Sequence, residues 1–297
     1  MKNHFLNKKI LITGATGSIG SEITKKLLSK NCKVIRALSN DENGLYDLSQ
    51  EISNQKKIRF IHGDISDLER CILATEDIDI VIHAAALKHV PLCEYNPFEA
   101  TKTNVIGTQN LVMASLKNNV KKFLHVSTDK VVDPISCMGA TKLLAERIVT
   151  NGNLIKGSKK TIFSCARFGN IIGSRGSVLP LFINQIKNNK SLTVTHKNMT
   201  RYFIGIKEAI NVLSNCIDQM RGGEIFIPNN LKIFKILDLA KALKIYYKKP
   251  NIKIRFSGIR QGEKLFEKLY ADSEIEKINV KKDFLVISQK RNNKRNS

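Results

Sequence analysis

The segment ILITGATGSIGSEITKKLL, residues 10–28, predicts how the fold begins. It starts with an apolar run typical of a buried strand, and after the glycines its apolar residues take helical spacing. The glycines fall in the turn between these elements, where backbone amides at a helix N-terminus can hold a pyrophosphate. A tight turn that binds nothing is the alternative, but the strand-loop-helix setting favours a dinucleotide loop. The loop residues expected to contact the cofactor are Gly14, Thr16, Gly17, Ser18, Ile19 and Gly20.

The first half of the chain repeats this alternation of strand and helix. Further apolar runs occur at residues 32–38, 58–63, 78–85, 121–128 and 161–169, and helix-like patterns fill most of the gaps. Strands alternating with helices predict a doubly wound parallel sheet, an α/β fold of the Rossmann type. We expect residues 1–166 to form the NAD(P)-binding domain, completed by parts of 203–228. One long amphipathic helix is predicted over residues 93–119, with Pro97 in its first turns.

The pattern changes beyond Arg167, where the elements become shorter and richer in Gly, Arg and polar residues. Residues 167–297 are therefore expected to form mainly a smaller, substrate-binding lobe that ends in a basic tail, QKRNNKRNS. Ligands of open α/β sheets bind at the carboxyl ends of the strands. The site is thus predicted between the two lobes.

Composition limits the class of protein. The chain has 297 residues, of which 42% are hydrophobic, and this predicts a folded globular protein. A net charge of +23 would suit a nucleic-acid partner, but the lysines are spread along the chain without interleaved aromatics or a zinc-finger pattern. We interpret them as a solvated surface, and nucleic acid is not expected as a partner. The six cysteines form no CxxC pair, so no metal site is predicted and the thiols are expected to be reduced.

Two further patterns concern location. The N-terminal apolar run is too short for a signal peptide, and no stretch approaches the ~20 apolar residues of a membrane span. A soluble cytoplasmic protein without a membrane partner is therefore expected.

The ends of the next three strands bear on the cofactor. An acidic residue at the end of the second strand would favour NAD and an arginine NADP, but here Ser39, Asn40 and Asp41 stand there, with Arg36 earlier. After the third strand Asp64 is placed to meet the adenine, and after the fourth a run of alanines allows close passage of the cofactor or is ordinary packing. The residues predicted to contact the cofactor here are Ser39, Asn40, Asp64, Ile65, Ala84, Ala85 and Ala86.

The segment STDKVVDPISCMGATKLLAE, residues 127–146, is similar to the catalytic stretch of short-chain dehydrogenases. Those enzymes place a tyrosine four residues before a lysine, whereas here Met138 precedes Lys142. A thioether can neither give nor take a proton. Taken alone, Met138 and Lys142 could be two positions of an amphipathic helix.

Taken with its other motifs, the chain resembles the extended short-chain dehydrogenase/reductase family. Within that family it resembles the UDP-N-acetylglucosamine 4,6-dehydratases of polysaccharide and flagellin-sugar pathways. The likeness runs from about residue 8 to residue 270. A methionine in place of the tyrosine is a feature of some branches, so Met138 does not indicate a dead enzyme. The motifs, in family order, are AALKHVPLCEYNPFEATKTNVIGT, STDKVVDPISCMGATK, RFGNIIGSRGSVLP, MTRYF, GGEIFIP and GIRQGEKLFE.

The resemblance implies a reaction and the residues that perform it. NAD(P)+ takes a hydride from C4 of the sugar, C5 loses a proton, water leaves from C6, and the hydride returns to C6. Asp129 and Lys130 match the positions used as acid and base, and we treat them as a coupled pair that shares protons. Lys142 is implied to hold the nicotinamide ribose, and Met138 occupies the tyrosine position. Thr128 or a water is predicted to relay the C4 hydroxyl proton. NADP is favoured over NAD, with Arg36 or a lysine reaching the extra phosphate because Asn40 replaces the family's usual arginine.

The resemblance also implies contacts with the nucleotide sugar. Arg201 and Arg260 match positions near the diphosphate, where guanidinium groups bind phosphate oxygens in pairs. Asn170 matches an amide that contacts the diphosphate. Glu263 is expected at the uridine ribose, and Lys88 in the sugar pocket.

Alternatives remain open at this stage. The reaction is expected to invert C5, with a C5-retaining dehydratase as the second option. A UDP-hexosamine 4-epimerase would need no C5 base and so does not require the Asp129-Lys130 pair. A non-catalytic NADP-sensing or nucleic-acid-binding protein is the remote alternative. The protein is expected to be a homo-oligomer.

Overall fold

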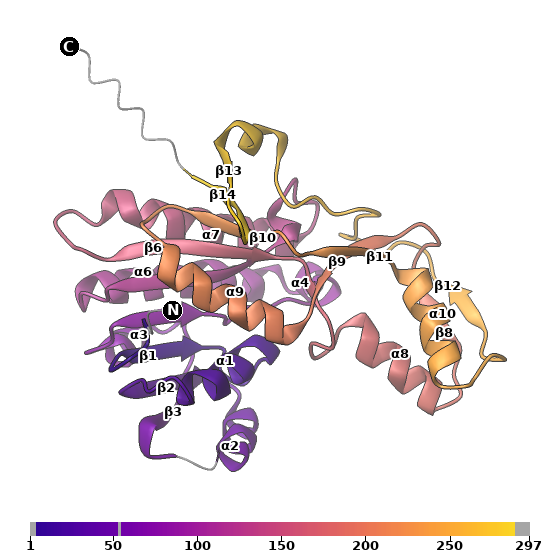
Figure 1. Cartoon of the computed structure of the whole chain (residues 1–297), viewed down its shortest axis with the longest axis horizontal. Helices are drawn as coiled ribbons and strands as arrows, with labels where there is room; N and C mark the ends of the chain where they lie inside the picture. The colour runs from indigo at the N-terminus through magenta and orange to yellow at the C-terminus, as the bar shows by residue number, and fades with distance from the viewer. Residues whose placement is uncertain (1–3, 53–54, 289–297) are drawn as a thin grey trace.

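A nine-stranded sheet forms the centre of the computed structural model, which describes residues 4–52 and 55–288 (Figure 1). The strand order is β13-β14-β10-β6-β5-β4-β1-β2-β3. In this order, all neighbouring strands between β10 and β3 pair in parallel. By contrast, β14 pairs antiparallel with β10, and β13 pairs antiparallel with β14. The strands are β1 (Lys9–Thr13), β2 (Val34–Ser39), β3 (Ile58–His62), β4 (Ile80–His83), β5 (Lys122–Thr128), β6 (Ile162–Phe168), β10 (Ile225–Pro228), β13 (Ile278–Val280) and β14 (Phe284–Ile287).

Alternation of apolar residues along β1 explains why helices cover both faces of this sheet. Ile10 and Ile12 belong to the core on one face, with α1 (Ser18–Leu28) and α9 (Ile206–Gln219). Leu11 belongs to the core on the other face, with α3 (Leu68–Thr75), α6 (Gly107–Lys117) and α7 (Cys137–Ile155). From Ile10 to Thr13 every side chain of the strand is thus buried on one face or the other. The predicted doubly wound α/β fold is confirmed.

The sequence predicted one helix over residues 93–119, and this continuity was wrong. The region contains α4 (Val90–Tyr95), α5 (Pro97–Ala100), a π-helical turn η2 (Thr101–Ile106) and then α6. The break lies at Asn96, whose φ of −123° and ψ of 64° are outside the helical region. The cause is Pro97, because a proline ring disfavours helical geometry in the residue before it.

A smaller lobe has its own apolar core, formed by α8 (Val178–Lys187), β8 (Leu192–Val194), α10 (Ile236–Tyr246) and β12 (Ile254–Phe256). Figure 1 shows it beyond the edge of the main sheet, connected through the three-stranded sheet β11-β9-β7. These strands are β7 (Asn170–Ile171), β9 (Thr200–Ile204) and β11 (Lys232–Lys235).

Chain segments after residue 167 also return to the large sheet. The helix α9 packs on it and β10 extends it, within the range 203–228 predicted to complete the first domain. The pair β13 and β14 adds its last two strands. The division of function at residue 166 stays a prediction, and the predicted basic tail, residues 289–297, lies outside the described residues. The remaining elements are α2 (Glu42–Glu51), η1 (Gln55–Lys57), η3 (Asp129–Val131) and η4 (Asp272–Lys277).

Candidate active site

A pocket of about 450 Å³ opens at the carboxyl ends of β1, β4, β5 and β6. This is the edge at which open α/β sheets bind ligands. It brings together most of the predicted site residues from segments far apart in sequence. Those that line it are Gly14, Gly17, Ser18, Ile19, Gly20, Ala84, Ala86, Lys88, Thr128, Lys130, Met138, Lys142 and Asn170.

The β1-α1 loop is shaped in a way that requires glycine. Gly14 has a φ of +64°, and a Cβ there would lie 2.7 Å from Ala85 Cα. A Cβ at Gly20 would lie 2.1 Å from the Gly14 carbonyl oxygen. Gly17 is the N-cap of α1 and provides no side-chain hydrogen bond to the first amides. The loop therefore leaves the positive end of α1 open toward the pocket, an arrangement that fits a pyrophosphate.

Hydrogen bonds join the ends of the neighbouring strands to this loop. Thr16 Oγ1 lies 2.9 Å from Ser39 Oγ, and Asn40 Nδ2 donates to Asp64 Oδ2 at 2.9 Å. Burial acts to raise the pKa of Asp64, but hydrogen bonds from Ser66 and Asn40 outweigh it and lower that pKa. An ionised, fixed carboxylate here is a good acceptor for a nucleoside. Ile65, by contrast, is buried in the core, so its predicted contact with the cofactor stays a prediction.

The side chain of Arg36 contacts the end of α3 and not the end of β2, where it was considered for a cofactor phosphate. Its Nη1 donates to the carbonyls of Ala74 at 3.0 Å and Glu76 at 2.6 Å, at the end of α3. Arg175 is found near that position instead. Its Nη1 lies 3.8 Å from Asp41 Oδ2, and its backbone amide donates to Ser18 Oγ at 2.8 Å. Sequence reasoning quoted its motif, RFGNIIGSRGSVLP, without selecting this residue.

Lys142 and Met138 both lie at the pocket on α7. Lys142 is buried, and its Nζ donates to the Val126 carbonyl at 2.7 Å and contacts His125 Nε2 at 3.0 Å. Burial lowers the pKa of Lys142 to about 8. Met138 is also buried and packs with Cys93 and Ala100. The helix face that would carry a tyrosine therefore carries an apolar side chain.

His125 lies next to Lys142, with its Nε2 3.0 Å from Lys142 Nζ. Burial, together with Lys142 and His83, lowers the pKa of His125 well below its ordinary value, so the ring is neutral. A neutral ring whose Nε2 faces an ammonium carries its proton on Nδ1. Among the described residues, that buried Nδ1 has no hydrogen-bond partner.

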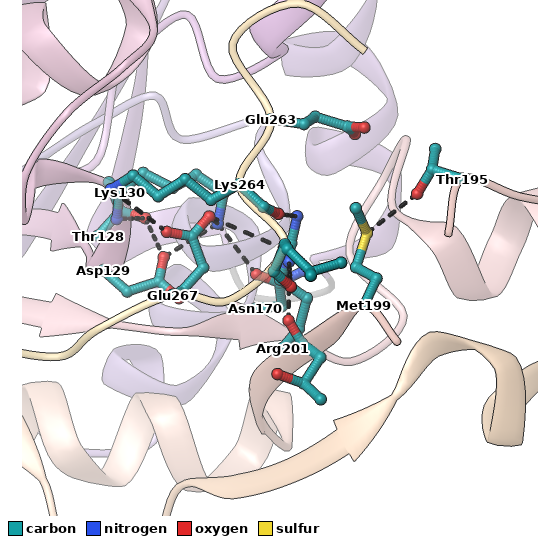
Figure 2. Close-up of polar contacts among 12 residues, drawn as sticks. Thr128, Asp129, Lys130, Asn170, Thr195, Met199, Arg201, Glu263, Lys264 and Glu267 are labelled. Atoms are coloured by element: carbon teal, nitrogen blue, oxygen red, sulfur yellow. Dashed lines mark hydrogen bonds and ion pairs between the residues drawn. The ribbon is translucent and has the colours of Figure 1, made fainter. Parts of the chain in front are cut away.

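The predicted acid-base pair lies where β5 ends and η3 begins (Figure 2). Lys130 Nζ donates to Asp129 Oδ1 at 2.9 Å and to Asn170 Oδ1 at 3.1 Å, and Thr128 Oγ1 donates to the same Asp129 oxygen at 3.0 Å. Asp129 is fully buried, whereas Lys130 is partly exposed and lines the pocket. The pair is thus held in one orientation, with the amine toward the pocket.

The segment GIRQGEKLFE, residues 258–267, lies beside this pair, but its glutamates differ. Glu263 is half-buried and accepts a hydrogen bond from the Arg260 amide at 3.3 Å. Glu267 is buried, with its Oε1 3.8 Å from Lys130 Nζ. Figure 2 shows Glu267 beside the pair and Glu263 pointing away from it. Sequence reasoning selected Glu263 and missed Glu267, although both carboxylates belong to one quoted motif.

The remaining substrate candidates are placed as follows. Arg201 is buried and donates to the carbonyls of Thr200 at 2.7 Å and Lys264 at 2.9 Å, so its guanidinium anchors the 258–267 segment. Arg260 is exposed, and neither it nor Glu263 lines the pocket. Lys88 Nζ donates to the Arg175 carbonyl at 2.6 Å at the pocket wall. Their substrate contacts stay predictions.

Within residues 4–52 and 55–288, no group of three or more His, Cys, Asp or Glu side chains could hold a metal ion. None of the helices in these ranges is both long and apolar enough to cross a membrane.

The doubly wound sheet, the glycine loop and the Asp129-Lys130 pair define an enzyme of the short-chain dehydrogenase/reductase class that acts on nucleotide sugars. More specifically, the chain belongs to the family described as polysaccharide biosynthesis protein, whose model matches residues 10–289.

The relatives carry the names of more than one enzyme activity. The chain is 45% identical over 266 residues to a UDP-N-acetylglucosamine 4,6-dehydratase (inverting) of Campylobacter jejuni, covering 89% of this chain and 77% of the relative. It is 40% identical over 277 residues to a UDP-glucose 4-epimerase of Rickettsia bellii, covering 92% and 80%. It is also 48% identical over 293 residues to an uncharacterized membrane protein of Methanocaldococcus jannaschii, covering 97% and 87%.

Solved structures show the same fold. Pen from Bacillus thuringiensis superposes with a TM-score of 0.92 at 39% identity, covering 96% of this chain and 89% of Pen. A dTDP-glucose 4,6-dehydratase of Streptomyces venezuelae, solved with NAD and TYD bound, has a TM-score of 0.81 at 22% identity and covers 86% of each chain. The second likeness concerns the fold alone.

Proposed function

We propose that this protein is a UDP-N-acetylglucosamine 4,6-dehydratase that inverts C5. The observation that carries the proposal is the Asp129-Lys130 pair, fixed at the end of β5 beside a glycine-lined dinucleotide pocket. The relatives named as inverting dehydratases support both the substrate and the stereochemistry. The product is a UDP-4-keto-6-deoxy-N-acetylhexosamine.

The residues present fit a dinucleotide cofactor. A Cβ at Gly14 or Gly20 would collide with backbone, and Ala84 and Ala86 keep the next strand end small. Ser18, Ile19 and Gly17 would flank the pyrophosphate at the start of α1, with Asp64 toward the adenosine end. Lys142 would hold the nicotinamide ribose. When bound, the nicotinamide supplies hydride chemistry, by which C4 is oxidised and C6 reduced.

Protons move between the sugar and this chain in a balanced set. The C4 hydroxyl and C5 each give up one proton, and the departing C6 hydroxyl and C5 each receive one. Lys130 acts as the base that takes the C5 proton, because Lys130 is the member of the pair that lines the pocket. Asp129, bonded to Lys130 and Thr128, shares the proton that leaves with the C6 hydroxyl as water.

Met138 lies where a tyrosine would take the proton of the C4 hydroxyl. Thr128 lines the pocket and already donates to Asp129, so it can pass that proton to the pair, directly or through a water. Met138 then contributes shape alone, by filling the space between α7 and α4.

The proposal is tested by incubating the purified protein with UDP-N-acetylglucosamine in D₂O, without added nicotinamide. We expect a product that has lost one water and gained one deuterium, formed in many-fold excess over enzyme, with the deuterium at an inverted C5. The readouts are mass spectrometry and NMR. Accumulation of one reduced nicotinamide per product would instead identify a net dehydrogenase.

A second candidate, the 4-epimerase, is supported by the relative from Rickettsia bellii that carries that name. Epimerisation needs only removal and return of a hydride, so the fixed Asp129-Lys130 pair would have no elimination to perform. An isomer of unchanged mass in the same incubation would favour it. Retention of the C5 configuration in a dehydrated product would favour the retaining dehydratase.

We propose NADP rather than NAD as the cofactor, with NAD as the alternative. Arg36 is occupied at the end of α3, so the proposal depends on Arg175, which reaches Asp41 near the end of β2. A ribose phosphate there would meet this largely exposed guanidinium. Denaturing the purified protein and identifying the released nucleotide by mass decides the matter, and released NAD would reverse the proposal.

Substitutions at Met138 and Lys130 test the mechanism. Met138→Leu keeps the apolar volume and neither adds nor removes a group that can transfer a proton, so activity should remain within about tenfold. Lys130→Met should abolish elimination, because losing a general base typically costs about 10²- to 10⁴-fold. Cofactor retention and UDP-sugar binding, measured by calorimetry, should persist. A Lys130→Met enzyme that exchanges C5 at the wild-type rate would contradict the mechanism.

A further inference from the structure

Glu267 is a buried carboxyl group that the reaction as described does not use. It belongs to the segment after β12, and only 8% of the residue is exposed. Burial of a carboxylate without compensating hydrogen bonds is costly. The buried carboxylate of Glu267 therefore has a role other than that of a solvated surface charge.

Three cations surround this carboxylate at distances too long for hydrogen bonds. Glu267 Oε1 lies 3.8 Å from Lys130 Nζ and 4.0 Å from Arg201 Nε, and Oε2 lies 3.8 Å from Lys264 Nζ. Within the described part of the chain, Glu267 Oε2 and Asp129 Oδ2 are both buried without a hydrogen-bond partner. Two buried carboxyl groups, from segments far apart in sequence, thus share the single amine of Lys130.

Charges on every side act on Glu267. Burial raises its pKa and nearby Asp129 raises it further, whereas Lys130, Arg201 and Lys264 lower it, and the pKa is raised on balance. Arg201 and Lys264 are themselves tied to backbone, Arg201 through the Lys264 carbonyl and Lys264 through the Val132 carbonyl. Lys130 is the cation among the three that lines the pocket.

We propose that Glu267 is a positioning residue that acts through Lys130, holding the amine between itself and Asp129 and setting how readily that amine gives up its proton. Glu267 is not among the residues that line the pocket, whereas Lys130 is. The inference rests on the proposed dehydratase function for its kinetic consequence. Its electrostatic consequence can be measured without any turnover.

The kinetic test compares the pH dependence of kcat for wild type and Glu267→Gln. The amine of Lys130 must be free of its extra proton to take the C5 proton, so the rate rises with pH as the coupled Asp129-Lys130 pair loses a proton. Removing a negative charge 3.8 Å from Nζ makes the ammonium less stable, and the rising limb should move to lower pH by about one to three units. Away from the limb, kcat should fall at least tenfold with KM little changed, because the amine loses its fixed orientation.

Two further variants separate this role from a structural one. Glu267→Asp keeps the charge and should return the limb toward wild type. Glu263→Gln, on the same segment but remote from Lys130, should raise KM for the nucleotide sugar without moving the limb. The matched surface control is Glu276→Gln, an exposed carboxylate on η4.

A readout that needs no activity uses acetic anhydride at a series of pH values. Lys130 is partly exposed, so peptide mass spectrometry can follow its acetylation as the pH rises. The midpoint of this acetylation profile should lie at lower pH in Glu267→Gln than in wild type and should be unchanged in Glu276→Gln. An unchanged profile in Glu267→Gln would overturn the inference, whether or not the wild type dehydrates UDP-N-acetylglucosamine. A failed wild-type incubation would overturn the proposed function alone.

Discussion

Lys142 shows how one residue ties the pocket to the core. Its chain enters at the pocket, yet its amine bonds to the Val126 carbonyl and the neutral ring of His125. These acceptors hold the amine, and no carboxylate of residues 4–52 or 55–288 forms an ion pair with it. Burial lowers the pKa of Lys142 to about 8, so the amine is partly neutral near physiological pH. An amine at this place can bind the cofactor whether it is charged or neutral. Burial of its positive charge, however, lowers the stability of the folded state.

The stability of the protein should therefore change with pH through Lys142. Its folded pKa of about 8 is below the ordinary lysine pKa of 10.5, so between these values the unfolded state binds more protons and stability rises with pH. Lys142→Met should be more stable than wild type at pH 7, by at most about 3 kcal/mol, and the difference should shrink toward pH 10. Chemical denaturation at both pH values measures it. A destabilised variant at pH 7 would show that the lost hydrogen bonds outweigh desolvation.

Single residues also mark the limit of what the sequence could predict. The glycine loop, Asp129 and Lys130 were predictable because each follows a recognisable strand end within a motif, and Lys142 because it belongs to the same motif as Asp129 and Lys130. Glu267 was not, because the same motif offers two glutamates and only its position beside Arg201 of β9 and Lys130 of η3 decides which is buried. Arg36 and Arg175 show the same limit: a long side chain can leave the position that its backbone suggests.

At the scale of elements, a buried ion network joins the sheet to the C-terminal segment. Arg167, on β6, lies 2.6 Å from Glu146 of α7 and 2.8 Å from Glu274 of η4. Ser127, at the end of β5, donates to the same Glu146 at 2.7 Å. The network thus braces the strand end that carries Thr128 and Asp129.

Removing the central cation should be severe. Arg167→Met would leave Glu146 and Glu274 buried without their partner, and breaking such a pair costs about 3–5 kcal/mol. The free energy of unfolding in urea measures the loss. Arg147→Met, at an exposed position of α7, is the control and should change stability by less than about 0.5 kcal/mol. Adding Glu146→Gln and Glu274→Gln to Arg167→Met should recover part of the loss. An Arg167→Met protein as stable as the control would show that the network contributes little.

Element by element, periodicity predicted the parallel strands well because residues buried on both faces form continuous apolar runs. It failed at residues 93–119, where apolar spacing continues across a break caused by Pro97. It also gave no sign that β13 and β14 return to the large sheet. Those strands have only three and four residues, too few for a periodic signal.

For the whole molecule, the predicted homo-oligomer has a candidate surface. Leu92, Tyr95 and Phe98 are 62%, 87% and 86% exposed on the adjacent short helices α4 and α5. Large apolar side chains gathered on one surface commonly mark a protein contact. A chain with a net charge of +23 repels its own copies at long range, so association would need an apolar contact of this kind.

We therefore expect a dimer or larger assembly of this chain, held partly by α4 and α5. Sedimentation velocity at physiological salt should give a mass at least twice that of one chain. Phe98→Asp should shift the protein toward monomer, because an ionised carboxylate at an apolar contact is poorly solvated. The control is Leu154→Asp. It introduces the same charge near the C-terminus of α7, at a residue that is 72% exposed, and should leave the assembly intact. Since α4 packs against α7, which carries Met138 and Lys142, the monomeric variant should also bind cofactor more weakly. A monomeric wild type, or a Phe98→Asp variant of unchanged mass, would assign this apolar surface to something other than self-association.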